Sequence, residues 1–184
     1  MEEVQTFTAS NLPSHFEWQL RDFARIVWSA DITRDISKSL HPEKWHPTYL
    51  VIADGALVIS AAAVLWKLVE IEHQAYKIYG LGMVLTYPAH RKQGYGRQIV
   101  AAATEFIKQT PDADLALLQT APHLARFYEP HGWRHTPKMK VLNGDPRSPI
   151  DEDGWLMMMF LSARAKRNQA AIELTTFYLD EHIW

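Results

Sequence analysis

A short loop that combines glycine with positive charge offers the clearest chemistry in this chain of 184 residues. Residues 91–97 read RKQGYGR and follow an apolar, β-rich run. Because glycine has no Cβ, phosphate oxygens can reach the backbone N–H groups of such a loop, and the N-terminus of a following helix adds about half a positive charge. The segment therefore predicts an anion-binding site. Its candidate residues are Arg91, Lys92, Gln93, Gly94, Tyr95, Gly96 and Arg97.

A purely structural explanation accounts for the same loop about equally well, because two glycines can simply let a strand and a helix pack together. A Walker phosphate loop is excluded, since no Gly-Lys pair followed by Ser or Thr is present. The dinucleotide fingerprint is excluded as well, because its third glycine is missing and antiparallel strands are expected before the loop.

The loop is expected to join a strand and a helix of a mixed α/β fold. Three β-rich runs lie between residues 49 and 86, and Asp54-Gly55 separates the first two, which is a strong hairpin signal. These runs predict an antiparallel meander. Residues 97–109 have apolar positions at helical spacing, and the apolar run 115–118 follows. Strand, helix and strand together predict a right-handed crossover with one parallel strand pair.

The rest of the chain completes one domain over residues 1–184. The other expected elements are a helix over 15–28, a short helix from 122 to about 132, strands over 138–142 and 155–161 with a polar loop over 143–154 between them, and a helix over 163–181. We expect residues 163–184 to be a C-terminal helical extension of the domain. Such an extension could cover a cleft or form a homodimer interface.

Composition excludes several classes of function. The net charge is −2 and no basic stripe is present, so a nucleic-acid partner is not expected. There is no cysteine, which removes disulfides, zinc thiolate sites and thiol nucleophiles. The nine histidines show no spacing typical of a metal site. The longest apolar run, 56–66, is too short to span a membrane and the N-terminus is no signal peptide, so we expect a cytoplasmic protein.

Two motifs in order resemble the GCN5-related N-acetyltransferase (GNAT) superfamily. Residues 84–97, VLTYPAHRKQGYGR, are similar to its acetyl-CoA motif, in which an apolar strand ends near a proline and Arg/Gln-x-x-Gly-x-Gly/Ala follows. Residues 125–133, ARFYEPHGW, resemble the family's tyrosine-bearing helix. The resemblance implies the GNAT fold, which has a central mixed, mostly antiparallel twisted sheet flanked by helices.

The resemblance implies acetyl-CoA as the co-substrate and assigns residues to its parts. Backbone groups of Val84, Leu85 and Thr86 would pair with the pantetheine arm like an added strand, and residues 92–97 would hold the pyrophosphate. Tyr128 would protonate the departing CoA thiolate. The alternative for Tyr128 is an aromatic side chain that only packs its helix onto the sheet.

Two positions depart from the family pattern. Ala121 stands where many members have an asparagine that contacts pantetheine. Pro130 falls inside the expected turn of the tyrosine-bearing helix and predicts that this helix ends early.

Over about residues 15–161 the chain also resembles the aminoglycoside 2′-N-acetyltransferases, in the hairpin 54–64 and in the polar loop 142–154. This resemblance implies that Asp151, Glu152 and Asp153 bind a polycationic acceptor. A solvated acidic loop explains the same residues equally well. One position argues against an aminoglycoside acceptor. That branch has a glutamate in the strand before the acetyl-CoA loop, and Gly82 occupies the aligned position here.

The general base is the least determined residue. Glu70 and Glu72 lie near the end of the second strand and would share one face by period-two alternation. Both could equally be solvated edge residues, and His73 and His90 are further candidates. With no cysteine, we expect direct acetyl transfer to a small amine in a ternary complex. A non-catalytic CoA-binding module and a peptide or protein amine acetyltransferase are the alternatives.

Overall fold

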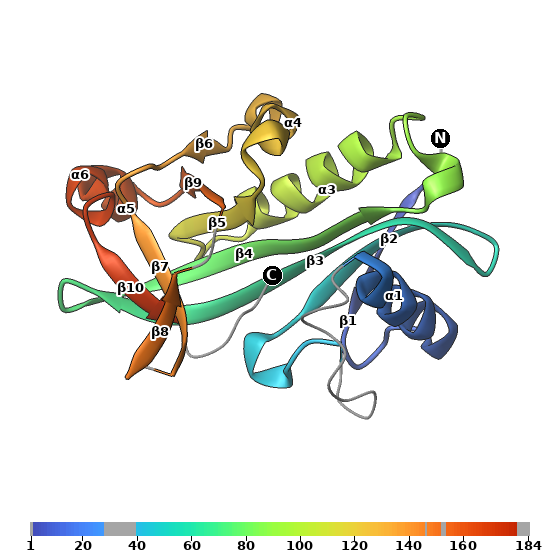
Figure 1. Ribbon diagram of the computed structural model, residues 1–184, viewed down its shortest axis with the longest axis horizontal. Coiled ribbons are helices and arrows are strands. Elements are labelled where there is room, and N and C mark those ends of the chain that lie inside the picture. The colour runs from blue at the N-terminus through green and yellow to red at the C-terminus, as the bar shows by residue number, and fades with distance from the viewer. Residues whose placement is uncertain (1, 28–39, 146, 152–153, 180–184) are drawn as a thin grey trace. The chain divides into compact units, whose positions relative to one another are not determined.

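The computed structural model describes residues 2–27, 40–145, 147–151 and 154–179. It contains a seven-stranded, mostly antiparallel sheet in the order β1-β2-β3-β4-β5-β9-β6, flanked by helices, and a three-stranded sheet in the order β10-β7-β8 (Figure 1). This confirms the mixed α/β class. Among the described residues, no helix is both long enough and apolar enough to cross a membrane.

The first half of the chain follows the predicted meander closely. Its elements are β1 (Val4–Thr8), α1 (Ser14–Val27), the 3-10 helix η1 (Glu43–Trp45), β2 (Thr48–Asp54), β3 (Leu57–Ile71), β4 (Gln74–Thr86), the 3-10 helix η2 (Pro88–His90), α3 (Tyr95–Gln109) and β5 (Leu115–Thr120). β4 and β5 are parallel, as the predicted crossover requires. β1 was not predicted from the sequence, and it pairs antiparallel with β2.

The second half contains shorter elements. They are η3 (Pro122–Leu124), α4 (Ala125–Tyr128), η4 (Glu129–His131), β6 (Arg134–His135), β7 (Lys140–Asp145), β8 (Ser148–Asp151), β9 (Trp155–Phe160), α5 (Ala163–Arg167), α6 (Gln169–Ile172) and β10 (Thr176–Leu179). The chain as a whole divides into two compact units. Unit 1 comprises Met1–Leu65 and Gly82–Glu105, and unit 2 comprises Trp66–Leu81 and Phe106–Trp184.

Unit 1 contains the hairpin that Asp54-Gly55 predicted. Asp54 pairs with Leu57, and Gly55 has a φ of 55°, which glycine adopts without steric cost. α1 supplies buried Phe16 and Leu20 to one apolar cluster. The strand residues in the same cluster are Tyr49, Val51, Ala53, Val58, Ala61, Ala63, Met83 and Leu85. The helix is therefore packed on one face of β2, β3 and β4.

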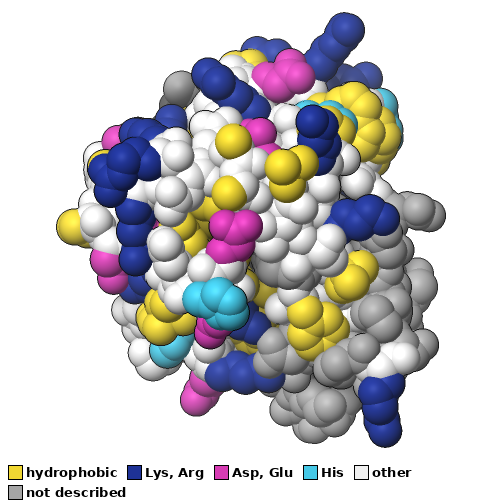
Figure 2. All heavy atoms as spheres, turned by 90° about the vertical axis from the view of Figure 1, so that its left-hand side faces the viewer, with side chains coloured by type: hydrophobic (Ala, Val, Ile, Leu, Met, Phe, Trp, Pro, Cys, Tyr) yellow, Lys and Arg dark blue, Asp and Glu magenta, His cyan; other side chains and the backbone are white. Residues whose placement is uncertain are grey.

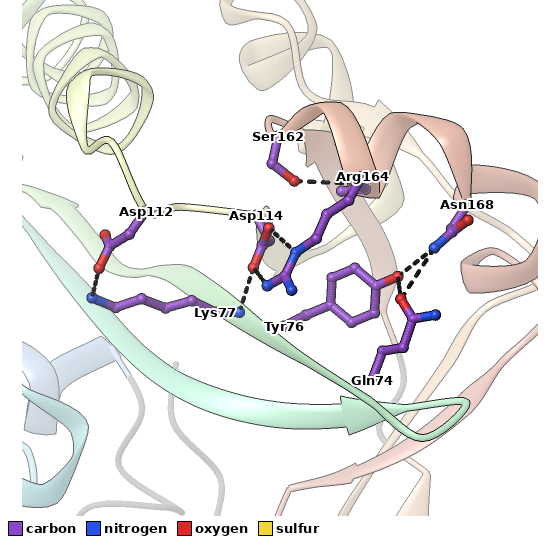
Figure 3. Close-up of polar contacts among 9 residues, drawn as sticks. Gln74, Tyr76, Lys77, Asp112, Asp114, Ser162, Arg164 and Asn168 are labelled. Carbon is purple, nitrogen blue, oxygen red and sulfur yellow. Dashed lines mark hydrogen bonds and ion pairs between the residues drawn. The ribbon is translucent and has the colours of Figure 1, made fainter.

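A buried carboxylate just before β5 links several elements of unit 2 (Figure 3). Asp114 is 4% exposed and accepts the backbone N–H of Lys77 at 2.9 Å and the Nε–H of Arg164 at 2.7 Å. The Arg164 guanidinium also donates through Nη2 and lies over the Tyr76 ring. Burial alone would raise the pKa of Asp114, but its hydrogen bonds, chiefly from Arg164, lower the pKa to about 2. The carboxylate thus ties α5 to β4 and β5.

The C-terminal third differs from the sequence prediction in two places. The polar loop expected over 143–154 is largely the hairpin β7–β8, in which Asp145 pairs with Ser148. The helix expected over 163–181 extends only to Ile172 and is interrupted at Asn168. Residues 176–179 form β10, which pairs parallel with β7, because a β-branched and aromatic run favours a strand once a partner strand is available. Within the described residues of the extension, 163–179, helical structure is therefore confined to the first part.

Candidate functional site

The predicted anion-binding loop in unit 1 joins a strand to a helix as expected. β4 ends at Thr86, η2 makes one turn, and α3 begins at Tyr95. Lys92 and Gly94 both adopt the left-handed backbone conformation, with φ of 63° and 94°. A Cβ added to Gly94 would meet no atom within 4 Å. The glycine is therefore needed for the backbone conformation of the loop and not for close packing.

α3 begins two residues earlier than predicted. The N–H of Gln98 donates to the Gly94 carbonyl at 3.0 Å, which makes Gly94 the residue just before the helix. Because the first N–H groups of a helix have no acceptor within it, those of Tyr95, Gly96 and Arg97 are available to a ligand. They lie at the positive end of the helix dipole, where a phosphate group is stabilised.

The loop carries three positive side chains that are not paired with any carboxylate of the described residues. Arg91, Lys92 and Arg97, which we call the loop cations, have exposed side chains. In the part of the chain that the structure describes, none of them forms an ion pair. The Nε–H of Arg91 donates to the Thr86 carbonyl at 3.2 Å, which fastens the loop to the end of β4. This charge is therefore free to attract an anion.

β4 departs from regular strand geometry just before the loop. Met83 is buried and has a φ of 49°, a conformation that residues other than glycine rarely adopt. Ser60 on β3 is fully buried, and its hydroxyl donates to the Leu85 carbonyl at 2.7 Å. It also lies 2.9 Å from the Thr86 hydroxyl. Sequence reasoning did not predict a role for Met83 or Ser60, although Ser60 is the one hydroxyl residue in the apolar run 56–66.

The predicted pantetheine residues lie beyond the part of β4 that pairs with β5. The register of β4 with β5 covers Ile78–Gly80 and Leu115–Leu117. Among the described residues, Val84, Leu85 and Thr86 therefore have no β5 partner. Such a strand edge can accept an extended ligand through main-chain hydrogen bonds.

Tyr128 lies in unit 2, at the end of α4. Pro130 falls in η4, so α4 ends at Tyr128, as the proline predicted, and Gly132 ends the segment with a φ of 97°. Tyr128 is 8% exposed, and burial raises the pKa of its phenol. A hydrogen bond with Thr120 acts in the opposite direction. The phenol is therefore protonated at neutral pH, which an acid requires. Ala121, in place of the family asparagine, is exposed.

The candidate bases lie at the turn between β3 and β4. β3 ends at Ile71, so Glu72 belongs to the turn and not to the strand. Glu72 and His73 have φ of 48° and 63°, as in a tight two-residue hairpin turn. Glu70 Oε1 lies 3.5 Å from His73 Nδ1, and both side chains are exposed. The other histidine candidate, His90, is half-buried, and its ring centroid lies 6.1 Å from those of Tyr87 and Tyr95.

The candidate acceptor residues are only partly described. Asp151 ends β8 and pairs with Leu142, whereas Glu152 and Asp153 lie outside the described residues. Gly82, at the position of the missing glutamate, is buried in β4. No group of three or more His, Asp or Glu side chains suited to a metal ion occurs in the described part of the chain.

A family model described as an acetyltransferase (GNAT) domain matches residues 15–136. Among solved structures, ElaA of Escherichia coli has a TM-score of 0.60 at 18% identity, over 86% of this chain and 99% of that chain. The GNAT family N-acetyltransferase YhbS of Escherichia coli, in complex with CoA, has a TM-score of 0.57 at 15% identity, over 99% of this chain and 91% of that chain.

An aminoglycoside 6′-N-acetyltransferase complexed with coenzyme A has a TM-score of 0.59 at 13% identity, over 88% of this chain and 98% of that chain. At these identities the structures show a shared fold alone. A search of curated proteins found no match.

Proposed function

Because the chain belongs to the GNAT acetyltransferase family, we propose that it transfers an acetyl group from acetyl-CoA to a primary amine of a small cationic molecule. The observation that carries the proposal is the loop at residues 91–97. It combines the left-handed Gly94, the first N–H groups of α3 and three cations that form no ion pair among the described residues, which together suit a pyrophosphate. The CoA bound to structures of the same fold supports the same donor.

In this proposal the donor lies along β4. The pantetheine arm pairs with the backbone of Val84, Leu85 and Thr86, and the pyrophosphate is held by residues 92–97. Ser60 and Arg91 position this edge, because each donates to a carbonyl of its last two residues. Their hydrogen bonds fix the strand end before the ligand arrives, which lowers the ordering cost of binding.

The proposed reaction is a direct displacement. The neutral amine attacks the thioester carbonyl carbon, the C–N bond forms, and the C–S bond breaks. Tyr128 gives its proton to the departing thiolate and recovers a proton from solvent afterwards; a phenol of pKa about 10 can protonate a thiolate that is only slightly less basic than its own phenolate. The proton lost by the amine goes through water to a base, for which Glu70 and Glu72 are the candidates. No covalent enzyme intermediate is needed.

The proposed acceptor class is aminoglycoside-like or polyamine-like. The acidic residues Asp151, Glu152 and Asp153 support a polycationic acceptor, because carboxylates recognise ammonium groups. Gly82 argues against the 2′-N-acetyltransferase specificity, since it removes a carboxylate from β4. The similarity to an aminoglycoside 6′-N-acetyltransferase is a similarity of fold, and it does not indicate which acceptor this chain uses. A cytoplasmic location and a homodimer stay predictions.

Two measurements test the proposal. Calorimetry with acetyl-CoA should give a dissociation constant of tens of micromolar or below. The absence of binding would refute acetyl-CoA as the acetyl donor. A thiol-release assay over an amine panel, with aminoglycosides and polyamines included, should then find turnover. An inert protein that still binds acetyl-CoA would instead support the non-catalytic module.

The Tyr128→Phe variant tests the acid. We expect kcat to fall by about 100-fold or more with acetyl-CoA affinity unchanged, since general acid catalysis contributes about 10²–10⁴-fold. Tyr178→Phe is the matched control, because it removes the hydroxyl of a tyrosine in β10, outside the proposed donor site, and keeps the ring. Full activity in Tyr128→Phe would contradict the role of Tyr128 as the acid and would show that its side chain only packs α4 onto the sheet.

A further inference from the structure

Unit 2 contains a cavity of about 720 Å³ that the acetyl-transfer proposal does not use. It is lined by the end of α3, by β6 and β9, and by α5 and α6. Three cations line it, Lys108, Arg134 and Lys166, which we call the cavity cations. We propose that this cavity binds a small phosphorylated molecule with an apolar body, independently of the acetyl-CoA loop.

Within the described part of the chain, the cavity cations have no carboxylate as a counter-ion. Among the described residues, none of the three forms an ion pair with a carboxylate. Lys108 donates through Nζ to the His131 carbonyl at 3.0 Å, which leaves its charge uncompensated. In the same unit, by contrast, Lys77 pairs with Asp112 at 2.7 Å. Three unpaired positive charges around one hollow create a local field that favours an anion.

The one carboxylate among the described lining residues does not cancel this charge. Glu173 accepts a hydrogen bond from the Gln169 amide at 2.7 Å, within the same helical segment. One carboxylate against three cations leaves the lining with an excess of positive charge. Figure 2 views the side of the molecule that carries α5, α6 and β10, and Lys and Arg side chains are prominent on the upper part of that face.

Two features hold the lining in place. Lys108 Nζ is held by the His131 carbonyl at 3.0 Å, and the next residue, Gly132, has a φ of 97°, a conformation that favours glycine. His135, which also lines the cavity, stacks on Trp155 with ring centroids 3.9 Å apart and an interplanar angle of 3°. Ordered side chains lose less entropy when a ligand binds.

The lining also indicates the kind of anion. Met158, Met159 and Phe160 give the cavity apolar walls, and methionine adapts its shape to an apolar group. The guanidinium of Arg134 can bind two oxygens at once, and two ammonium groups add further donors. A phosphate monoester offers three acceptor oxygens and close to two negative charges, so it satisfies these donors better than a carboxylate does. The volume falls within the range of small-molecule sites.

The probe for the test is 1-naphthyl phosphate, with 1-naphthol as the uncharged analogue. Its affinity is measured by calorimetry for the wild type and for Arg134→Gln/Lys166→Gln. We expect the double substitution to weaken naphthyl phosphate binding by about tenfold or more, which corresponds to a loss of about 1.4 kcal/mol or more in binding free energy. We expect naphthol to bind weakly to both proteins.

Two control variants make the result specific. Arg126→Gln/Arg167→Gln removes the same charge from exposed residues outside the lining and should change the affinity by less than about twofold. Arg91→Gln/Arg97→Gln changes the acetyl-CoA loop and should leave naphthyl phosphate binding intact. Acetyl-CoA affinity should be unchanged in Arg134→Gln/Lys166→Gln.

Several outcomes would overturn the inference. No binding of naphthyl phosphate would do so, as would equal weakening by the control pair outside the cavity. Loss of binding only in the Arg91→Gln/Arg97→Gln protein would place the probe at the acetyl-CoA loop. Failure of acetyl-CoA binding in the wild type would count against the proposed function alone, because the cavity assay contains no CoA.

Discussion

Replacing Asp114 by asparagine should lower the free energy of unfolding by about 2–3 kcal/mol at neutral pH. The substitution keeps the size of the side chain and removes its charge, so that the contacts with Arg164 lose their ionic component. Arg164 has an exposed fraction of 46% and can turn to solvent. The change therefore leaves no buried, unpaired guanidinium, and the loss should stay below that of a fully buried pair.

The magnitude and its pH dependence follow from the pKa of the carboxyl. Its pKa is about 2 in the folded protein, against about 3.9 in an unfolded chain. At about 1.36 kcal/mol for each pKa unit, the difference corresponds to about 2.6 kcal/mol. Because the folded pKa is the lower one, this stabilisation is complete above about pH 5 and is lost as the pH falls toward 2. At pH 3 about half of it remains.

Urea unfolding of both proteins at pH 7, 5 and 3 measures this difference. The matched control is Asp112→Asn, which removes a carboxylate that pairs with Lys77 at 2.7 Å but is 62% exposed. Exposed ion pairs contribute at most about 1 kcal/mol, so the control should be nearly neutral. A difference for Asp114→Asn that does not change between pH 7 and pH 3 would refute the electrostatic explanation. So would a loss no larger than that of Asp112→Asn.

Two substitutions near the loop give further expected outcomes. Gly94→Ala should weaken acetyl-CoA binding several-fold in calorimetry, because a φ of 94° strains an alanine by about 1–2 kcal/mol although nothing would clash with its Cβ. Gly55→Ala, at a left-handed position that is equally open but lies in another turn, should leave the affinity unchanged. Ser60→Ala should lower the free energy of unfolding by about 1–2 kcal/mol in urea, since the buried Leu85 carbonyl loses its hydroxyl donor. Wild-type stability in Ser60→Ala would mean that water replaces the hydroxyl.

The sequence predicted the parts of the fold that depend on local signals. Asp54-Gly55 marked a hairpin, and the glycine-containing loop marked the start of α3 to within two residues. The C-terminal third depends on distant pairing, because Thr176 pairs with Lys140, which is far away in the sequence. Local helix propensity therefore predicted a helix where a partner strand produced β10.

The site shows the same division. The loop cations are adjacent in sequence and were predicted as a group. Ser60 and Leu85 belong to different strands, and nothing in a single sequence shows that one donates to the other. The left-handed conformation of Met83 gives no signal either, since methionine has no preference for it.

Unpaired cations are informative in this protein because its charges nearly balance. The chain has 19 Lys and Arg residues against 21 Asp and Glu, so a cation without a partner does not simply reflect a shortage of carboxylates. The loop cations and the cavity cations are two small groups of this kind. At physiological salt the field of such a group decays within about 8 Å, so an anion must enter the loop or the cavity to gain from it. A long polyanion would need a continuous row of charges. We therefore expect small phosphorylated ligands at both groups, and the absence of a nucleic-acid partner stays a prediction from the net charge of −2.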